Sequence, residues 1–284
     1  MFEKILICTD FADGLHRLTH FVSSLAAGGI KQVVFLHVVP LSEKGIIPKV
    51  DSEQIEQAQS RLSAAMDNSL TEVDVKIEVQ SGRPVEMILR VAQGYQSELI
   101  VLGSQAHSLL TEKLIGSIMA DLSHQTTIPL LVLRPQLIAA FTAEELALRC
   151  QHLLRYLLVP YDGSETSNFL VQQIKQLAQK QPRPYLECCR LCWVTDRQLP
   201  SQLERDTLSQ VKADLETAAL QVKAEFHRGS VLTELLELAQ MDGISAIAIA
   251  SGTIGTFQEW LVSSVAAELL RQSWCPVLFF PSKQ

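Results

Sequence analysis

Short apolar runs alternate along the chain with longer stretches in which apolar residues recur every three or four positions. This alternation predicts strands connected by helices. The runs KILIC and ELIVL are continuously apolar, as central parallel strands covered on both faces should be, whereas VDVKIEVQ alternates and predicts an edge strand. In the first half we expect strands near residues 4–9, 32–39, 73–80, 98–102 and 129–133, and helices near 13–27, 52–70, 84–94 and 116–125. This order predicts an α/β fold with a doubly wound five-stranded parallel sheet.

The second half of the chain repeats the first. The segment SELIVLGS aligns without a gap with ISAIAIAS, which places Gly103 opposite Ala250, and KILICTD near the start corresponds to YLLVPYD. Such a duplication predicts two tandem domains, residues 1–135 and 154–284. Residues 136–153 connect them.

The connecting segment carries a helix signal of its own. Thr142 and Glu145 have the spacing of a capping box, and leucines after them form an apolar stripe. We therefore expect a connecting helix that packs on the body of the protein rather than a free tether.

Composition narrows the possible partners. The chain has 24 Lys and Arg against 31 Asp and Glu, a net charge of −7, and only 19% charged residues. This surface is a poor match for nucleic acid or for an anionic membrane. Apolar runs stay short of the roughly 18 residues that cross a membrane, and the first residues do not resemble a signal peptide. We expect a cytoplasmic protein without a nucleic-acid or membrane partner.

The cysteines do not indicate a metal site or a redox site. The segment LECCRLCWV contains a C-x-x-C between Cys189 and Cys192, but its apolar composition predicts a strand, where residues three apart point to opposite faces. A second C-x-x-C that would complete a metal site is missing. We expect buried free thiols and no metal site.

Polar residues follow the predicted strands, at the edge where an open parallel sheet binds its ligands. They are Asp10, Asp162, Gly103, Ser104 and, at the first turn of the helix SIMADLSHQ, Gly116 and Ser117. The N–H groups of a helix start favour a phosphate, and glycine permits its close approach. A carboxylate could accept hydrogen bonds from a ribose or an adenine amine.

Simpler interpretations stay open for the same residues. Gly116 and Ser117 are ordinary residues at a helix start. Asp10 and Asp162 could be turn or helix-capping aspartates. His37, on an apolar strand, is more typical of a hydrogen-bonded core histidine than of a ligand.

These segments resemble the universal stress protein family in its tandem two-domain form. The resemblance is carried by VPYDGSE, FLHVV, SGRPVEMIL and the pattern G-x-x-A-(nine)-G-S over residues 103–117. It implies Rossmann-like domains with strand order 3-2-1-4-5 and an adenine nucleotide, ATP with or without Mg²⁺, in the first domain. Asp10 would lie near the nucleoside, the backbone of Val38 would meet adenine, and the loop would cover the phosphates. The implied binding residues are Asp10, Val38, Gly103, Ser104, Ala106, Gly116, Ser117 and Ile118.

The sequence departs from the family's pattern G-x-x-G-(nine)-G-[S/T] in both halves. Ala106 replaces the second glycine, and Phe11 and Ala12 replace the usual Gly-Ser after the first aspartate. In the second half the three glycine positions hold Ala250, Thr253 and Ser263. The weaker candidate residues there are Asp162, Val194, Ser263 and Ser264, and we expect no nucleotide in that domain.

Motifs for catalysis, such as a Walker loop or a nucleophile elbow, are missing from the sequence. Three hypotheses follow: a stress protein that binds ATP as a regulatory signal, a nucleotide-free interaction module with unidentified protein partners, or a very slow ATPase. The family resemblance also implies pairing through the fifth strands, 129–133 and 276–280, as a pseudo-dimer within one chain that could associate further into a homodimer.

Overall fold

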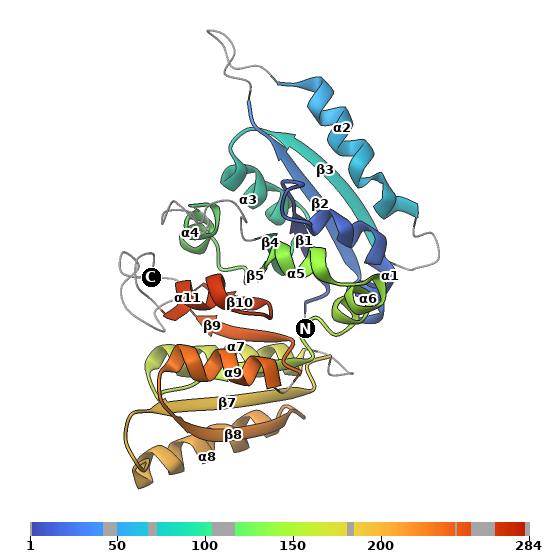
Figure 1. Ribbon diagram of the computed structural model, residues 1–284. Coiled ribbons are helices and arrows are strands. Elements are labelled where there is room, and N and C mark those ends of the chain that lie inside the picture. The colour runs from blue at the N-terminus through green and yellow to red at the C-terminus, as the bar shows by residue number, and fades with distance from the viewer. Residues whose placement is uncertain are drawn as a thin grey trace. The chain divides into compact units, whose positions relative to one another are not determined.

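The computed structural model describes residues 2–41, 50–67, 73–103, 117–180, 185–241, 243–250 and 265–281. The chain divides into two compact units, Phe2–Gln151 and His152–Gln284 (Figure 1). Each unit has its own set of parallel strands and its own apolar core, so the fold is α/β with two tandem doubly wound sheets.

The strands of the first unit lie in the order β3-β2-β1-β4-β5, which confirms the expected topology. They are β1 (Lys4–Cys8), β2 (Gln32–Val39), β3 (Asp74–Ser81), β4 (Leu99–Gly103) and β5 (Leu130–Leu133), all parallel to their neighbours. The two continuous apolar runs became the central strands β1 and β4, whose side chains are almost wholly buried. The alternating run became β3, half-exposed at the edge.

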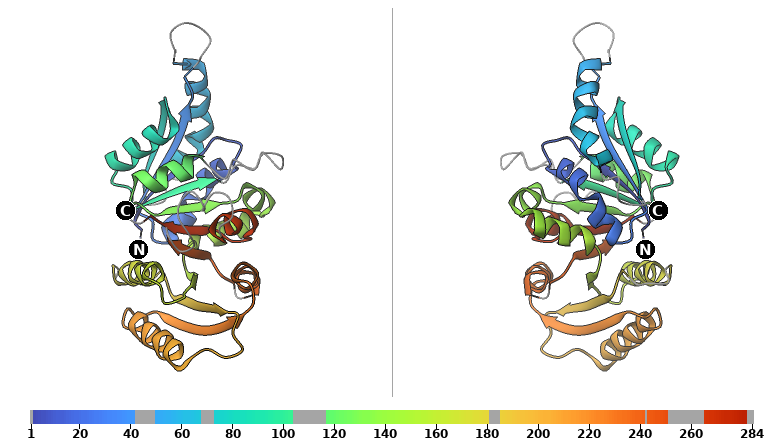
Figure 2. Two further views of the ribbon diagram at one scale, coloured as in Figure 1. Left: turned by 90° about the vertical axis from the view of Figure 1, so that its left-hand side faces the viewer. Right: turned by 90° about the vertical axis from the view of Figure 1, so that its right-hand side faces the viewer.

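Helices cover both faces of this sheet (Figure 2). One face carries the 3₁₀ helix η1 (Leu15–Phe21), α1 (Val22–Ala27), α2 (Ser52–Leu62) and η2 (Ser63–Asp67), which contact one another. The other carries α3 (Pro84–Gly94) and α4 (Ser117–Gln125). Gly82, with a φ of 144°, makes the turn from β3 into α3, and Pro84 is the first residue of that helix, which has the predicted bounds.

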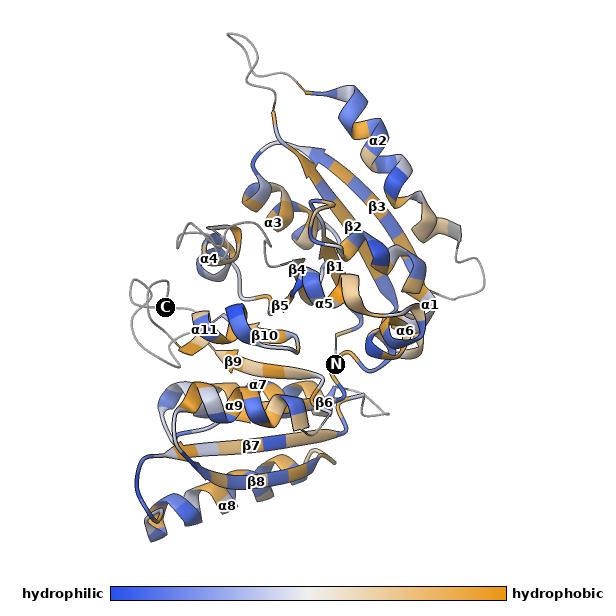
Figure 3. Cartoon of the chain, viewed as in Figure 1, coloured by the Kyte–Doolittle hydropathy of each residue, from blue (hydrophilic) through white to orange (hydrophobic). Residues whose placement is uncertain are grey.

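The second unit repeats this plan with the order β8-β7-β6-β9-β10. Its strands are β6 (Tyr156–Pro160), β7 (Cys188–Thr195), β8 (Gln221–Arg228), β9 (Ala246–Ala250) and β10 (Val277–Phe280). Its helices are α7 (Glu165–Gln179), α8 (Gln202–Glu216), α9 (Val231–Met241) and α11 (Val265–Gln272). In both units the apolar residues concentrate on the strands and the polar residues on the outer helix faces (Figure 3).

The connecting segment forms two helices, α5 (Pro135–Ala140) and α6 (Ala143–Gln151), rather than the single helix expected. The predicted capping box explains the break: the Glu145 N–H donates to the Thr142 hydroxyl (3.3 Å), and the Thr142 N–H donates to the Glu145 carboxylate (2.9 Å). A new helix therefore begins after Thr142. Both helices pack on the first unit, where α6 contacts α1 and α5 contacts η1.

The C-x-x-C segment lies on β7, as predicted, and Cys189 and Cys192 are buried. All six cysteines are free thiols. Within the described ranges, no three His, Cys, Asp or Glu side chains are grouped as a metal site requires. No helix in the described part of the chain combines the length and the apolar character needed to cross a membrane.

Candidate functional site

The ends of β1 and β4 lie side by side in the first unit, at the point where the strand order reverses. Cys8 on β1 is paired in register with Leu102 on β4, so the residues that follow, up to Asp10 and at Gly103, meet at one edge of the sheet. In open α/β sheets this edge is where ligands bind. The helix α4 (Ser117–Gln125), whose N-terminal N–H groups could receive a phosphate, lies within the predicted range 116–125.

Asp10 forms a tight turn immediately after β1. Its Oδ1 atom accepts hydrogen bonds from the backbone N–H groups of Ala12 (2.8 Å) and Asp13 (2.9 Å), and the residue is exposed. The alternative interpretation of Asp10 as a turn aspartate is therefore confirmed. The turn uses one carboxylate oxygen and holds the group at the strand end, where it could also contact a nucleoside.

The backbone N–H and C=O of Val38 face the edge of β2 that pairs with β1, at a point beyond the last residue of β1. The Thr9 N–H, one residue past β1, donates to the Leu36 carbonyl (2.9 Å). Backbone groups two residues apart on a strand point the same way, so the Val38 N–H and C=O face that side beyond the last β1 bond. His37 Nδ1 lies 2.8 Å from the Thr9 carbonyl and donates to it, which is the hydrogen-bonded histidine that the sequence suggested.

Phe11 has an unusual backbone conformation in the same turn. Its φ is +66°, a value that strains a residue with a side chain by about 1 kcal/mol. Its ring lies 4.5 Å from the His37 ring, centroid to centroid, and the Arg61 guanidinium stands 3.9 Å from the Phe11 centroid. These contacts hold the ring over the end of β2.

The second unit has a glycine at the position of Phe11 in the corresponding turn. Gly163, the counterpart of Phe11, also has a positive φ of +79°. A Cβ on Gly163 would come within 3.2 Å of the Trp193 ring, and Trp193 is the counterpart of His37. A large ring therefore fills this position in each unit, from the turn in the first and from β7 in the second.

Asp13 is the residue of this edge that sequence reasoning missed. It is buried, with 5% of its surface exposed. Its Oδ1 accepts hydrogen bonds from the Thr9 hydroxyl (2.7 Å) and the Leu15 N–H (2.9 Å), and its Oδ2 accepts one from the Asp10 N–H (3.2 Å). Burial raises the pKa of Asp13 to about 6, although the bonds from Thr9 and Leu15 partly oppose that rise. The sequence placed Asp13 at the start of the first predicted helix, and nothing in the pattern pointed its side chain inward.

Asp13 also explains why residue 103 is a glycine. A Cβ added to Gly103 would lie 2.4 Å from the Asp13 Cβ and 3.0 Å from its Oδ2. Packing against Asp13 therefore requires a glycine at residue 103, independently of any ligand.

Several candidate residues lie outside the part of the chain that the structure describes. They are Ser104, Ala106, Gly116, Ser263 and Ser264. The backbone of Ser117 starts α4, and Ile118 in the same turn is half-buried.

At the second unit's strand ends, the aspartate turn is retained. Asp162 Oδ1 accepts from the Ser164 N–H (2.9 Å), and the Ser164 hydroxyl caps α7 by accepting from the Ser167 N–H (3.2 Å). The Tyr161 N–H donates to the Cys192 carbonyl, so Val194 has the orientation described for Val38. This unit therefore keeps the first-strand and second-strand geometry.

A buried ion pair distinguishes the sheet of the second unit. Arg190 on β7, 5% exposed, donates from Nε to Glu225 Oε2 on β8 (3.1 Å), and the Lys223 ammonium lies 2.9 Å from Oε1. Burial by itself would raise the pKa of Glu225, but the hydrogen bonds and charges of Lys223 and Arg190 outweigh it and lower the pKa to about 2. Glu225 is therefore ionised throughout the physiological range.

Two doubly wound α/β units in tandem, each with an aspartate turn after its first strand, define the class of this protein. The model of the Universal stress protein family matches residues 1–134 and 154–281. The chain therefore belongs to the universal stress protein family.

Solved structures agree on the fold. A universal stress protein from Archaeoglobus fulgidus DSM 4304 is 17% identical, with a TM-score of 0.71 over 99% of this chain and 97% of that one. A functionally unknown protein from Pseudomonas aeruginosa PAO1 is 13% identical, with a TM-score of 0.57 over 98% and 92%. No curated protein matches the chain significantly.

Proposed function

We propose that the protein binds an adenine nucleotide, ATP, in its first unit and that occupancy serves as a regulatory signal. The observation that supports this proposal is the meeting of three strand ends in that unit. The Asp10 turn after β1, the backbone of Val38 on β2 and Gly103 at the end of β4 share one edge. Family membership supports the choice of a nucleotide as ligand.

In the second unit we propose a vacant site. Ala250 stands where Gly103 stands in the first unit and is fully buried at the end of β9. Together with the loss of glycine at residues 253 and 263, this methyl group would narrow the approach of a phosphate. The second unit would then contribute structure or partner contacts rather than a ligand.

Calorimetry with ATP, with and without Mg²⁺, tests both proposals. The wild-type chain should bind one ATP. Gly116→Val should abolish binding, because its side chain would fill the space expected for a phosphate. The matched control is Ser263→Val at the corresponding position of the second unit, which should bind like the wild type. Equal binding by wild type and Gly116→Val would reject the proposed site.

A second candidate is a nucleotide-free interaction module. It is favoured by Gly103, because packing against Asp13 accounts for this glycine without any ligand. Protein purified free of nucleotide, with a melting temperature that ATP and Mg²⁺ leave unchanged, would support it. A slow ATPase would instead require ADP release above a Gly116→Val control.

We propose a reducing cellular compartment, such as the cytoplasm, as the site of action. The support comes from the six cysteines, all of which are free thiols. Proteins of oxidising compartments tend to pair theirs.

A further inference from the structure

A buried carboxylate lies at the edge of the sheet where the proposed function expects a polyanion. Asp13 packs directly against Gly103, the residue from which the proposed phosphate loop starts. Its 5% exposure means that water screens its charge poorly. A phosphate held near Gly103 would therefore meet a fixed carboxylate.

The position of this carboxylate is fixed by its bonds. Three donors hold its two oxygens: the Thr9 hydroxyl and the N–H groups of Leu15 and Asp10. The titratable groups of the described residues that face it are Cys8 on β1 and Asp10 in the turn, and neither offers a positive charge. No lysine, arginine or histidine of the described residues forms an ion pair with Asp13. Among the described residues, its charge thus has no compensating cation.

The second unit offers an internal comparison. Glu165, which corresponds to Asp13 in the alignment of the two first strands, lies exposed in the first turn of α7. There the strand-end glycine has become Ala250. The acidic side chain that is buried against the end of the fourth strand in the first unit, the unit that we propose to be occupied, therefore has an exposed counterpart in the second.

We propose that Asp13 sets the ligand preference of the first unit by disfavouring any phosphate whose charge is not neutralised. This inference rests on the proposed function. It makes the site favour a nucleoside or a magnesium-complexed nucleotide over a free nucleotide polyanion, because Mg²⁺ removes much of the like-charge repulsion at Asp13. The carboxylate acts on the ligand through its charge and need not touch the base.

The test compares adenosine, ATP in EDTA and ATP with Mg²⁺ by calorimetry. Asp13→Ser removes the charge and keeps a hydroxyl that can accept from the Leu15 N–H, as Ser164 caps α7. This variant should bind free ATP about tenfold more tightly than the wild type, with adenosine unchanged within about twofold and a smaller gain for magnesium ATP. Asp206→Ser, an exposed site on α8, is the control with the same change in net charge and should bind like the wild type.

The outcomes separate the two proposals. Parallel changes in adenosine and ATP affinity, or none, would overturn the role of Asp13 and leave the proposed function standing. Failure of adenosine, free ATP and magnesium ATP alike to bind any of the three proteins would overturn the proposed function and this inference with it.

A second measurement needs no variant at all. Adenosine 5′-(methyl phosphate) carries one negative charge that does not titrate near neutral pH, because the diester lacks the second phosphate ionisation. Burial places the pKa of Asp13 at about 6. As the pH falls from about 7.5 to about 5, the affinity of the wild type for this diester relative to adenosine should rise several-fold. A flat ratio would overturn the inference.

Discussion

Gly103 cannot gain a side chain without displacing Asp13. Gly103→Ala would place a Cβ 2.4 Å from the Asp13 Cβ, an atom fixed by its own backbone. We expect a loss of about 1–3 kcal/mol in the free energy of unfolding, because the turn must shift to relieve the overlap. Urea denaturation followed by circular dichroism measures it. Gly94→Ala is the matched control, since no atom lies within 4 Å of a Cβ at that position, and an equal effect of both substitutions would contradict the packing argument.

The raised pKa of Asp13 makes stability depend on pH in a defined direction. The folded chain holds this proton up to about pH 6, whereas an unfolded aspartate releases it near pH 4. Between those values the folded state binds more protons, so the free energy of unfolding should fall by about 2–3 kcal/mol as the pH rises from 4 to 6. Denaturation of wild type and Asp13→Asn across this window isolates the effect. A difference between the two that does not vary with pH would refute it.

Of the residues at this edge of the first unit, the sequence identified Asp10 and Gly103 but not Asp13. Asp10 and Gly103 could be found because each follows an apolar strand and carries an expected residue type. Asp13 could not, because its inward direction depends on the left-handed backbone of Phe11 (φ +66°) and Gly14 (φ +73°) on either side. A phenylalanine in that conformation is stabilised by its ring contacts, which connect segments far apart in the chain.

At the scale of elements, strands were easier to predict than helix ends. In a central strand every side chain is buried, and in an edge strand every second one is. The continuous apolar run KILIC therefore predicted a central strand, and the alternating run VDVKIEVQ predicted an edge strand. The first helix was expected from residue 13 but begins as a 3₁₀ helix at Leu15, because its N-cap Gly14 has a left-handed backbone and the Leu15 N–H is bonded to the Asp13 carboxylate. In the connecting segment, the sequence revealed the capping box that starts α6. It did not reveal the separate short helix α5 before Thr142.

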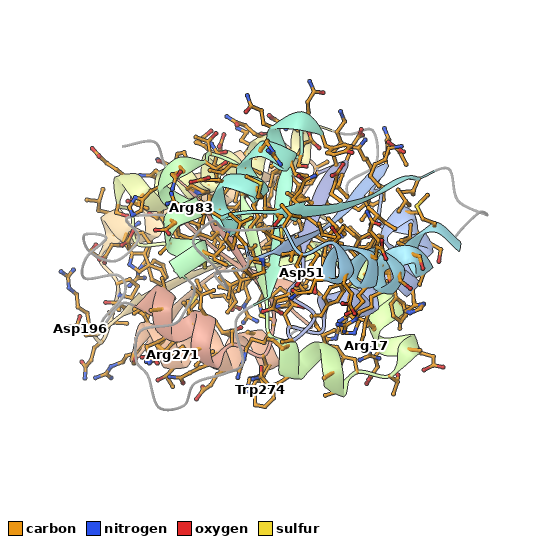
Figure 4. The ribbon with its side chains drawn as sticks, turned by 90° about the horizontal axis from the view of Figure 1, so that it is seen from above. Arg17, Asp51, Arg83, Asp196, Arg271 and Trp274 are labelled. Atoms are coloured by element: carbon orange, nitrogen blue, oxygen red, sulfur yellow. The ribbon has the colours of Figure 1, made fainter. Side chains whose placement is uncertain are left out.

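One arginine links both connecting helices to η1, in addition to their packing contacts. Arg17 on η1 donates to the carbonyls of Ile138, at the end of α5, and of Phe141 (3.2 Å), at the turn into α6 (Figure 4). We expect Arg17→Ala to cost about 1–3 kcal/mol, because two carbonyls at the end of a helix lose a charged donor. This loss of stability should be confined to α5 and α6.

Hydrogen exchange measured by mass spectrometry distinguishes a local from a general effect. Peptides covering residues 135–151 should exchange faster in Arg17→Ala, while peptides from the central strands β1 and β4 change little. Arg83→Ala is the control, because Arg83 is exposed and pairs only with its helix neighbour Glu86 among the described residues. Unchanged exchange in α5 and α6 would show that Arg17 does not hold them.

At the scale of the whole molecule, the two units share a fold but differ in their response to acid. Asp13 in the first unit has a raised pKa, and Glu225 in the second has a pKa lowered to about 2. A lowered pKa in the folded state contributes stability that is present above the unfolded value near 4.3 and is lost as the pH falls toward 2. Acid should therefore weaken the second unit at pH values where the Asp13 contribution favours the first.

The tryptophans make this difference measurable, because Trp193, Trp260 and Trp274 all belong to the second unit. During acid titration, tryptophan emission should report unfolding at a higher pH than the loss of helical circular dichroism from the whole chain. Glu225→Gln should lower the stability of the second unit by about 1–2 kcal/mol at pH 7, because Arg190 is buried and loses its charged partner, while Glu225 itself is partly exposed. That deficit relative to the wild type should disappear as the pH falls from about 4 to about 2, when Glu225 itself takes up a proton. If the deficit stays constant through that range, or if emission and circular dichroism change together, the ion pair does not set the acid response of the second unit.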